Sequence, residues 1–181
     1  QVDRTTSGGK ISDTIPCPGN GVTFIAGSGA DSSCYMVGSN GTIYRSYWTK
    51  GTDITPMPCT VGNGVGWVTA SGGINRSYFL RSDGRIQYTC GGGKIEDKII
   101  ECQNDSTGLG YIGISSQMRV PRGGKGEDYS NQANYFVRAD GSIDRTTGAG
   151  KNINNVVAPN GLTYLAASAG ASASCKLWVV V

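Results

Sequence analysis

Side chains that could bind a sugar without catalysing a reaction recur along this sequence of 181 residues. Aromatic faces pack against the C–H groups of sugars, while planar arginine, aspartate and asparagine side chains hydrogen-bond the hydroxyls. Tyr47 and Trp48 follow a predicted hairpin, where a buried role is not required, so they are the best candidates for a contact surface. The candidate ligand-binding residues are Asp3, Arg4, Tyr44, Arg45, Tyr47, Trp48, Tyr88, Asp144 and Arg145.

Four lysines recur just after the predicted hairpins, at equivalent places in the sequence: Lys10, Lys50, Lys94 and Lys151. If the repeated units form a ring, these lysines lie on one rim, where four ammonium groups could bind sulfate or an acidic glycan. The alternative is that each lysine solvates a turn and protects a strand edge from aggregation.

The composition offers few of the residues that commonly catalyse reactions. The chain has no histidine, which removes the commonest general base, the usual nucleophile pairs and most zinc sites. Asp83 and Asp140 recur, but each lies in a predicted turn, where aspartate is favoured for backbone reasons. We therefore predict a protein that is not an enzyme, with no metal and no cofactor; hydrolysis by a carboxylate pair is the rival prediction.

Charge and hydropathy bound the partners. The net charge is only +3, and no basic run forms the stripe that a nucleic-acid binder usually carries. No segment reaches the ~18 apolar residues of a membrane span. We expect neither nucleic-acid binding nor membrane insertion, and glycans or glycoproteins are the expected partners.

The elements that must position the candidate residues are repeated β-hairpins. Three passages read as a strand, then Asn-Gly or Asp-Gly, then a strand: residues 35–45, 78–88 and 135–145. Asn-Gly and Asp-Gly accept the positive φ angles of a two-residue hairpin turn. With 29 glycines and no convincing helical period, the sequence predicts an all-β fold.

Each hairpin is flanked by two further strands, and the fourth unit is split between the ends of the sequence. Residues 2–10 are nearly a copy of residues 143–151, while residues 174–178 parallel residues 33–37. We predict a four-bladed β-propeller of four-stranded repeats whose last blade is closed by the N-terminal strands. A single barrel or a β-prism is the alternative. The single repeat domain, 1–181, divides into units of about 20–62, 63–107, 108–158, and 159–181 plus 1–19.

The hairpin Tyr78-Phe79-Leu80-Arg81-Ser82-Asp83-Gly84-Arg85-Ile86 resembles the repeat of regulator-of-chromosome-condensation-like propellers. It is also similar to the repeat of the bacterial β-lactamase-inhibitor protein built on that fold, and to tectonin and tachylectin-type lectin propellers. The resemblance covers the whole chain as a pattern. It implies a propeller that binds glycans, a partner enzyme or another protein, and it assigns no individual residue.

Cysteines and sequons favour secretion. Six cysteines without a CxxC pair favour disulfides over a metal site, and Asn-X-Ser/Thr sequons begin at Asn40, Asn75 and Asn104. The sequence starts at Gln1, as a processed mature protein would. We expect a secreted, disulfide-bonded glycoprotein. The pairing stays open among Cys17, Cys34, Cys59, Cys90, Cys102 and Cys175, and Cys34 is predicted to be equivalent to Cys175.

The third unit carries a glycine-rich insert, residues 115–134, with three cationic residues and two acidic ones. Long loops are often functional, so the insert could hold a protein partner; a tolerated insertion is the alternative. The first functional prediction is a secreted lectin-like protein that acts by multivalent, non-catalytic binding. The alternative is a protein–protein module, such as an inhibitor of a secreted hydrolase.

Overall fold

A computed structural model gives the fold of the chain. For Cys90 and residues 94–98, 152–154 and 174–180 it describes the backbone alone. The described residues are 1–5, 10–30, 33–59, 62–73, 76–90, 94–102, 107–116, 134–146, 152–160, 162–169 and 174–180.

Three four-stranded antiparallel sheets form the centre of the molecule, and we call them blades 1, 2 and 3. The strands of each blade pair in sequence order, so every blade is a meander. The blades are β3 (Phe24–Gly29), β4 (Ser33–Gly38), β5 (Ile43–Tyr47) and β6 (Thr55–Met57); β7 (Trp67–Ser71), β8 (Tyr78–Arg81), β9 (Ile86–Cys90) and β10 (Lys94–Ile100); and β11 (Tyr111–Ser116), β12 (Asn134–Arg138), β13 (Ile143–Thr146) and β14 (Asn152–Val156).

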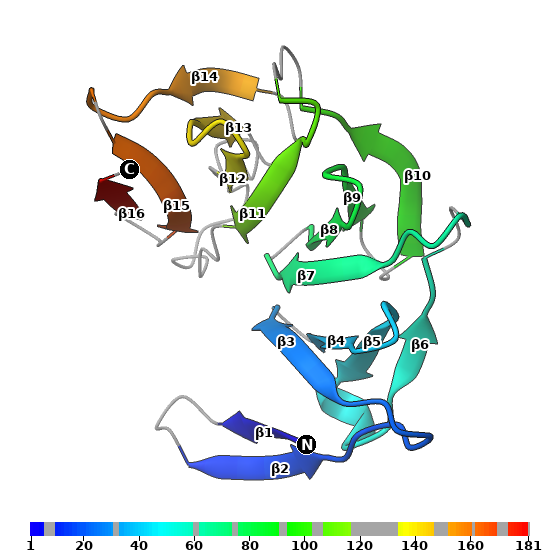
Figure 1. Ribbon diagram of the computed structural model, residues 1–181. Coiled ribbons are helices and arrows are strands. Elements are labelled where there is room, and N and C mark those ends of the chain that lie inside the picture. Colours follow the sequence, from blue (N-terminus) through cyan, green and yellow to red (C-terminus); the bar gives the residue numbers. More distant parts are fainter. Residues whose placement is uncertain are drawn as a thin grey trace.

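Two half-blades lie at the ends of this array. β1 (Val2–Thr5) pairs with β2 (Ile11–Ile15), and β15 (Leu162–Ala169) pairs with β16 (Ser174–Val180). The sheets follow one another along an arc, with β3, β7, β11 and β15 on its inner side (Figure 1). The all-β repeat architecture is confirmed. The two parts of the predicted fourth blade form separate two-stranded sheets at opposite ends of the arc, so closure of the ring stays a prediction.

The hairpin turns join one blade to the next. Each Asn-Gly or Asp-Gly glycine has a positive φ, as the sequence predicts. Its carbonyl accepts the amide of an aromatic residue on the next inner strand, which is the first residue of β7 and of β11 and the third residue of β15. At Gly84 the approach leaves no room for a side chain, because a Cβ would lie 2.0 Å from the Leu109 carbonyl oxygen. The three bonds run from Trp67 to Gly41 (2.9 Å), from Tyr111 to Gly84 (2.8 Å) and from Tyr164 to Gly141 (2.9 Å).

The arc has two faces that differ in their connections. The turn face carries the three Asn-Gly and Asp-Gly hairpins together with the links between blades. The loop face carries the connections between the first and second strands of each blade, and between the third and fourth. Lys10, Trp48 and Lys50 belong to connections on the loop face.

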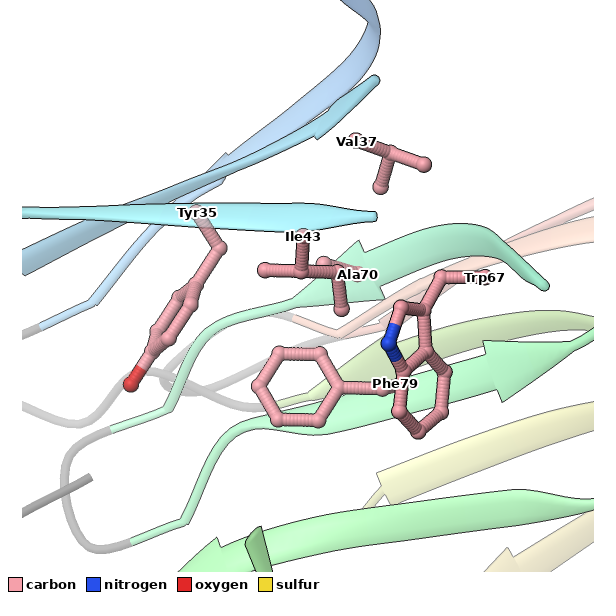
Figure 2. Packing of buried hydrophobic residues seen from close by; sticks show 6 residues of the cluster. All are labelled: Tyr35, Val37, Ile43, Trp67, Ala70 and Phe79. Atoms are coloured by element: carbon pink, nitrogen blue, oxygen red, sulfur yellow. The ribbon is translucent and has the colours of Figure 1, made fainter. Parts of the chain in front are cut away.

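The core lies between neighbouring sheets, because alternate residues of a strand point to opposite faces. Figure 2 shows the joint between blades 1 and 2, where Tyr35 and Ile43 meet Trp67 and Phe79. The rings of Tyr35 and Phe79 lie edge to face, 5.1 Å apart. One residue along in β8, Tyr78 points the other way into the joint between blades 2 and 3.

One predicted equivalence is wrong by a residue. The β-bulge follows the first residue of β3, β7 and β11, and in β15 it follows the third residue, Tyr164. Tyr164 pairs with Trp178 across β15–β16 as Phe24 pairs with Gly38 across β3–β4. The register therefore makes Cys175 equivalent to Tyr35, and Cys34 equivalent to Ser174. The bulges after Phe24 and Tyr164 are equivalent points of the two hairpins, and matching them sets this register. The residue pattern alone does not show where a bulge lies.

Candidate functional site

Arg4 and Trp48 meet on the loop face, where the half-blade β1–β2 joins blade 1. Trp48 begins the short 3-10 helix η1 (Trp48–Lys50), which follows β5 directly. Its side chain is 54% exposed, and the guanidinium carbon of Arg4 lies 4.9 Å from its ring centroid. Arginine stacks on aromatic faces through cation–π attraction. Two residues that are 44 positions apart in sequence thus form one surface.

Arg4 is held by neighbours on both sides of the joint. Its Nε donates to Asp13 Oδ2 at 3.1 Å, and its Nη1 donates to the Tyr47 carbonyl oxygen at 3.4 Å. The hydrogen bond from Arg4 lowers the pKa of Asp13, so this carboxylate stays charged. Because these contacts occupy the guanidinium, Arg4 positions the joint and the Trp48 ring.

A second cationic group covers Tyr47, next to Trp48. The guanidinium carbon of Arg45 lies 4.2 Å from the Tyr47 ring centroid, and the Lys50 ammonium lies 6.0 Å from the same centroid. Three cations therefore border two aromatic rings at the edge of blade 1. This arrangement suits a ligand that combines an apolar face with hydroxyl or anionic groups.

A small hollow opens beside Trp48. Its volume is about 180 Å³, which is below the ≈ 300–1,000 Å³ of pockets that enclose drug-sized ligands, so it suits one small group of a larger ligand. Burial raises the pKa of the Cys34 thiol, so this thiol stays protonated and is a poor nucleophile. The hollow is lined by Arg4, Thr5, Gly29, Ala30, Ser33, Cys34 and Trp48.

Three predicted ligand-binding residues instead lie in the interior. Tyr44 packs edge to face on Phe24, with ring centroids 5.8 Å apart. Tyr88 is buried between blades 2 and 3, with the Arg76 guanidinium 4.9 Å from its ring centroid. Asp144 is only 1% exposed. The prediction of a surface role is wrong for these three side chains in this structure, because their strand positions face the joints between sheets.

The remaining predicted contact residues lie apart from one another. Asp3 on β1 accepts a hydrogen bond from the Thr14 hydroxyl at 2.8 Å. Arg145 lies on β13, two blades away from Trp48. The structure thus brings together Arg4, Arg45, Tyr47 and Trp48 from the predicted set.

The predicted lysine rim is described in part. Lys10 and Lys50 are exposed on the loop face, and Lys94 begins β10 on the same face. Lys151 lies outside the described residues. No distance tests whether these lysines share one ligand, so the rim stays a prediction.

The cysteines do not form the predicted disulfides among the described side chains. Cys17, Cys34, Cys59 and Cys102 carry thiols, while the side chains of Cys90 and Cys175 lie outside the described set. These four cysteines belong to different sheets and connections, and the fold does not pair them. No group of three or more Cys, Asp or Glu side chains that could hold a metal ion occurs in the described part of the chain.

The insert predicted at residues 115–134 is described only at its two ends, and residues 117–133 lie outside the described residues. Ser116 ends β11, and its amide donates to Ser71 Oγ at 2.8 Å. Asn134 begins β12, and its Nδ2 donates to the Tyr78 hydroxyl at 3.1 Å. Both ends of the insert are therefore anchored to blade 2 on the loop face.

The sequence analysis missed an aliphatic stripe on the inner strands. In each inner strand the residue at the β-bulge is exposed, and bulges commonly re-aim a side chain. The sequence carries a signal for this stripe, because each of these residues directly follows an aromatic residue at or near the start of its strand. The stripe consists of Ile25 (61% exposed), Val68 (44%), Ile112 (49%) and Leu165 (51%).

A larger groove lies on the turn face between blades 1 and 2, and Ile25 of the aliphatic stripe forms part of its wall. Its volume is about 510 Å³. Its other walls are the hairpin turn 38–42, the link residues Pro58, Cys59 and 64–66, and Trp67 and Ser82. Peptide groups and small residues dominate this lining, so the groove can offer both hydrogen bonds and an apolar side.

Comparison with known proteins identifies the fold. No protein-family model matches the chain, and no curated protein is similar to it in sequence. Among solved structures, human WBSCR16 is similar with a TM-score of 0.60 and 10% identity, over 86% of this chain and 44% of that one. BBS1N in complex with ARL6DN is similar with a TM-score of 0.60 and 12% identity, over 97% of this chain and 56% of that one. YCF48 from Cyanidioschyzon merolae is similar with a TM-score of 0.50 and 12% identity, over 78% of this chain and 38% of that one.

These neighbours are β-propeller-type folds, and at such low identity the likeness concerns the fold alone. The chain spans about half the length of the structures it matches. In the described part of the chain, no helix is long and apolar enough to cross a membrane.

Proposed function

We propose that this protein binds carbohydrate without catalysis, through the exposed Trp48 ring on the loop face. The observation that carries the proposal is the half-exposed Trp48 beside a small hollow, with its orientation held by Arg4. A sugar ring packs its C–H face on the indole, while Ser33 and Thr5 at the hollow offer hydroxyls. The resemblance to tectonin-type and regulator-of-chromosome-condensation-like propellers supports a binding role and remains a prediction.

The charge around Trp48 favours an acidic sugar. Arg45 and Lys50 add positive charge next to Tyr47, and Asp13 pairs with Arg4. A carboxylate or sulfate on the ligand would approach Lys50, since the Arg4 guanidinium is already engaged. The attraction should weaken with salt, because exposed charges are screened.

The aromatic platform occurs once per chain. Aligning the four units places Ser7, Gly91 and Gly148 at the position of Trp48. We therefore propose one principal glycan site in each chain. The multivalent binding predicted from the repeat then requires several chains to act together.

A glycan array tests the proposal. The wild-type protein should bind a related set of acidic glycans at physiological salt, and Trp48→Ala should weaken that binding at least about tenfold through the lost stacking surface. Leu109→Ala is the matched control, because Leu109 is 66% exposed on the turn face. Absence of glycan binding by the wild-type protein, or equal binding by Trp48→Ala, would contradict the proposal.

We further propose that the protein is secreted and glycosylated, on the support of the three sequons. The Asn40 side chain lies at an exposed turn, where its Nδ2 donates to the Tyr44 hydroxyl at 3.0 Å. Secretion from a eukaryotic host should add a mass that a peptide-N-glycosidase removes. An unmodified secreted chain would contradict glycosylation, and retention in the cell despite a secretory leader would contradict secretion.

A second candidate is a protein-binding module, favoured by the aliphatic stripe. Ile25, Val68, Ile112 and Leu165 expose apolar surface on neighbouring inner strands, and exposed apolar patches often mark interaction sites. One structural neighbour, BBS1N, was solved in complex with ARL6DN. Screening against secreted hydrolases tests this candidate: inhibition that Val68→Asp abolishes and Trp48→Ala leaves intact would support it over glycan binding.

The two half-blades complete the proposed fold. We propose that β15–β16 and β1–β2 are the inner and outer halves of one fourth blade, since they occupy the first two and the last two strand positions of the repeat. The blade count of four per chain depends on this pairing.

A further inference from the structure

β1 and β16 each have an edge that lacks the partner found in the complete blades. In blades 1 to 3 the second strand pairs with the third, as β12 pairs with β13. β16 is a second strand and β1 is a third strand, yet each pairs only with its own hairpin partner. Unpaired strand edges are templates for pairing with another strand.

The register of the missing pairing can be read from blade 3. β15 pairs with β16 through the same bulged register as β11 with β12. β1 pairs with β2 through the same bulged register as β13 with β14. Transferring the β12–β13 register to β16 and β1 gives four cross-strand pairs: Ser174 with Thr5, Cys175 with Arg4, Lys176 with Asp3, and Leu177 with Val2.

These pairs are chemically complementary. Leu177 opposite Val2 repeats the apolar pairs Val37–Ile43, Leu80–Ile86 and Val137–Ile143, which are at most 2% exposed in the complete blades. Lys176 opposite Asp3 joins opposite charges, which stabilise an antiparallel pair. The fold thus matches both apolar and charged positions across two strands that lie apart.

The two half-blades also carry residues equivalent to the partners of a buried hydrogen bond in blade 3. The Tyr111 hydroxyl donates to Asp144 Oδ2 at 2.8 Å, and Asn155 Nδ2 donates to Asp144 Oδ1 at 3.1 Å. The register makes Asp3 equivalent to Asp144 and Tyr164 equivalent to Tyr111. The Thr14 hydroxyl already binds Asp3 as Asn155 binds Asp144. The tyrosine partner lies on the other half-blade, where Trp178 holds the position of Arg138.

In the core of the joint between β1–β2 and blade 1, most of the apolar side chains come from blade 1. At the joints after blades 1, 2 and 3, the second strand of the preceding blade supplies a tyrosine and an aliphatic residue, such as Tyr78 and Leu80. At the first joint the preceding half-blade supplies only Val2 and Ile15, which pack on blade 1. Cys175 and Leu177 hold the equivalent positions on β16.

The curvature of the arc decides where the missing half comes from. The two half-blades stand at opposite ends of an open arc (Figure 1). Aromatic rings pack across the joints between blades 1 and 2 and between blades 2 and 3. Bringing the ends together within one chain would require these joints to repack.

We propose that two copies of the chain associate head to tail, with β16 of each copy pairing to β1 of the other. Each copy supplies three complete blades and two halves, so the pair closes a ring of eight blades through two identical joints. Closure removes both open edges, which limits further association. It also places two Trp48 sites on one loop face, which would give the two-site binding that a single chain lacks.

Two variants, each with one added cysteine, test the pairing. Thr5→Cys and Ser174→Cys are purified separately, mixed and oxidised, so that a disulfide between the two substituted positions can form only between copies. We expect a disulfide-linked dimer whose digest contains that peptide pair. Mixing Ser12→Cys with Ser174→Cys is the matched control, because Ser12 lies on β2, away from the proposed pairing edge.

Light scattering and a charge swap complete the test. The wild-type chain should elute as one species of twice 18.8 kDa. Lys176→Glu should weaken association roughly tenfold, since two joints gain like charges, and adding Asp3→Lys should restore it. A stable monomer at every concentration, or a cross-link that forms only when both cysteines are in one chain, would overturn the proposal.

Discussion

Blades 1 and 3 use the same backbone register to hold different chemistry. In blade 3, the last residue of the second strand is Arg138, and Asp144 follows it across the hairpin on β13. In blade 1 the equivalent residues are Gly38 and Tyr44. The comparison separates what the repeat requires of the backbone from what it leaves open to the side chains.

In blade 3 this position forms a buried ionic network. Arg138 Nε donates to Asp144 Oδ2 at 3.1 Å, and both the Tyr111 hydroxyl and Asn155 Nδ2 donate to the same carboxylate. Asp144 is thus fully partnered, as a buried charge must be. Burial, together with the hydrogen bond to Asp144, raises the pKa of Tyr111 far above its ordinary value.

In blade 1 the same position is filled by an aromatic ring. Tyr44 packs on Phe24, and its hydroxyl accepts from Asn40 at 3.0 Å. Gly38 leaves the space for this ring, because a Cβ there would lie 2.8 Å from Tyr44 Cε2. The repeat therefore fixes strand pairing and turn geometry, while each blade satisfies its own interior.

Removing the charge of Asp144 should have the largest effect. Asp144→Asn removes the buried carboxylate that Arg138 Nε contacts and leaves the longer pair between Arg138 Nη1 and Asp140 at 3.7 Å. It should reduce the free energy of unfolding by about 3 kcal/mol. Tyr44→Phe, in blade 1, removes one hydrogen bond and should cost about 1 kcal/mol. Urea-induced unfolding of the two variants measures both values. Equal losses would show that blade 3 does not depend on its ion pair.

The second-largest effect should be the difference in stability between variants of the buried arginines in blades 2 and 3. Arg81 is 1% exposed, and its Nε and Nη1 have no hydrogen-bond partner among the described residues. Arg138→Met removes the cation that pairs with the buried Asp144. Arg81→Met removes one cation from Asp83, which is partly exposed and still contacts Arg85 at 3.6 Å. We expect Arg138→Met to be less stable than Arg81→Met by about 2 kcal/mol. Thermal unfolding gives the order, and a reversed order would refute it.

Filling the space at Gly38 should disturb blade 1 through crowding. Gly38→Ala brings a Cβ within 2.7 Å of Asn40 Oδ1 and 2.8 Å of Tyr44 Cε2, and overpacking of this kind costs about 1–3 kcal/mol. Gly29→Ala is the control, because a Cβ there meets nothing within 4 Å. Chemical denaturation should separate the two variants, and a neutral Gly38→Ala would mean that Tyr44 moves freely.

The smallest expected effect concerns high pH. Burial raises the pKa of Tyr78 to about 12, above the ordinary value of about 10. The unfolded chain therefore loses this proton first, so the stabilisation is present below pH 10 and is lost as pH rises towards 12. By pH 11 the loss should reach about 1.4 kcal/mol. Tyr78→Phe should remove this part of the pH dependence, and an unchanged slope would contradict the prediction.

Strands and turns were predictable because their signals are local. The hairpin predicted at residues 78–88 matches β8 and β9, and the Asn-Gly and Asp-Gly turns occur where the sequence places them. The position of Tyr44 was not predictable. It lies on the same strand as Arg45, and the choice between surface and interior depends on which face of the sheet meets the neighbouring half-blade.

The candidate site was predictable in its members and not in its grouping. Arg4 and Trp48 each stood out as residue types, but their contact requires β1–β2 to pack against blade 1. The aliphatic stripe was missed, since a β-bulge shifts one residue per inner strand out of simple alternation.

By itself, the sequence determined the all-β class, the repeat and the hairpin turns, because period-two patterning and glycine turns act between neighbouring residues. The tertiary structure decided the rest: the open arc, the two separate half-blades, the buried Asp144 and the exposed Trp48 beside Arg4. These depend on how whole sheets pack against one another, and the angle at each joint comes from many side chains that are distant in sequence.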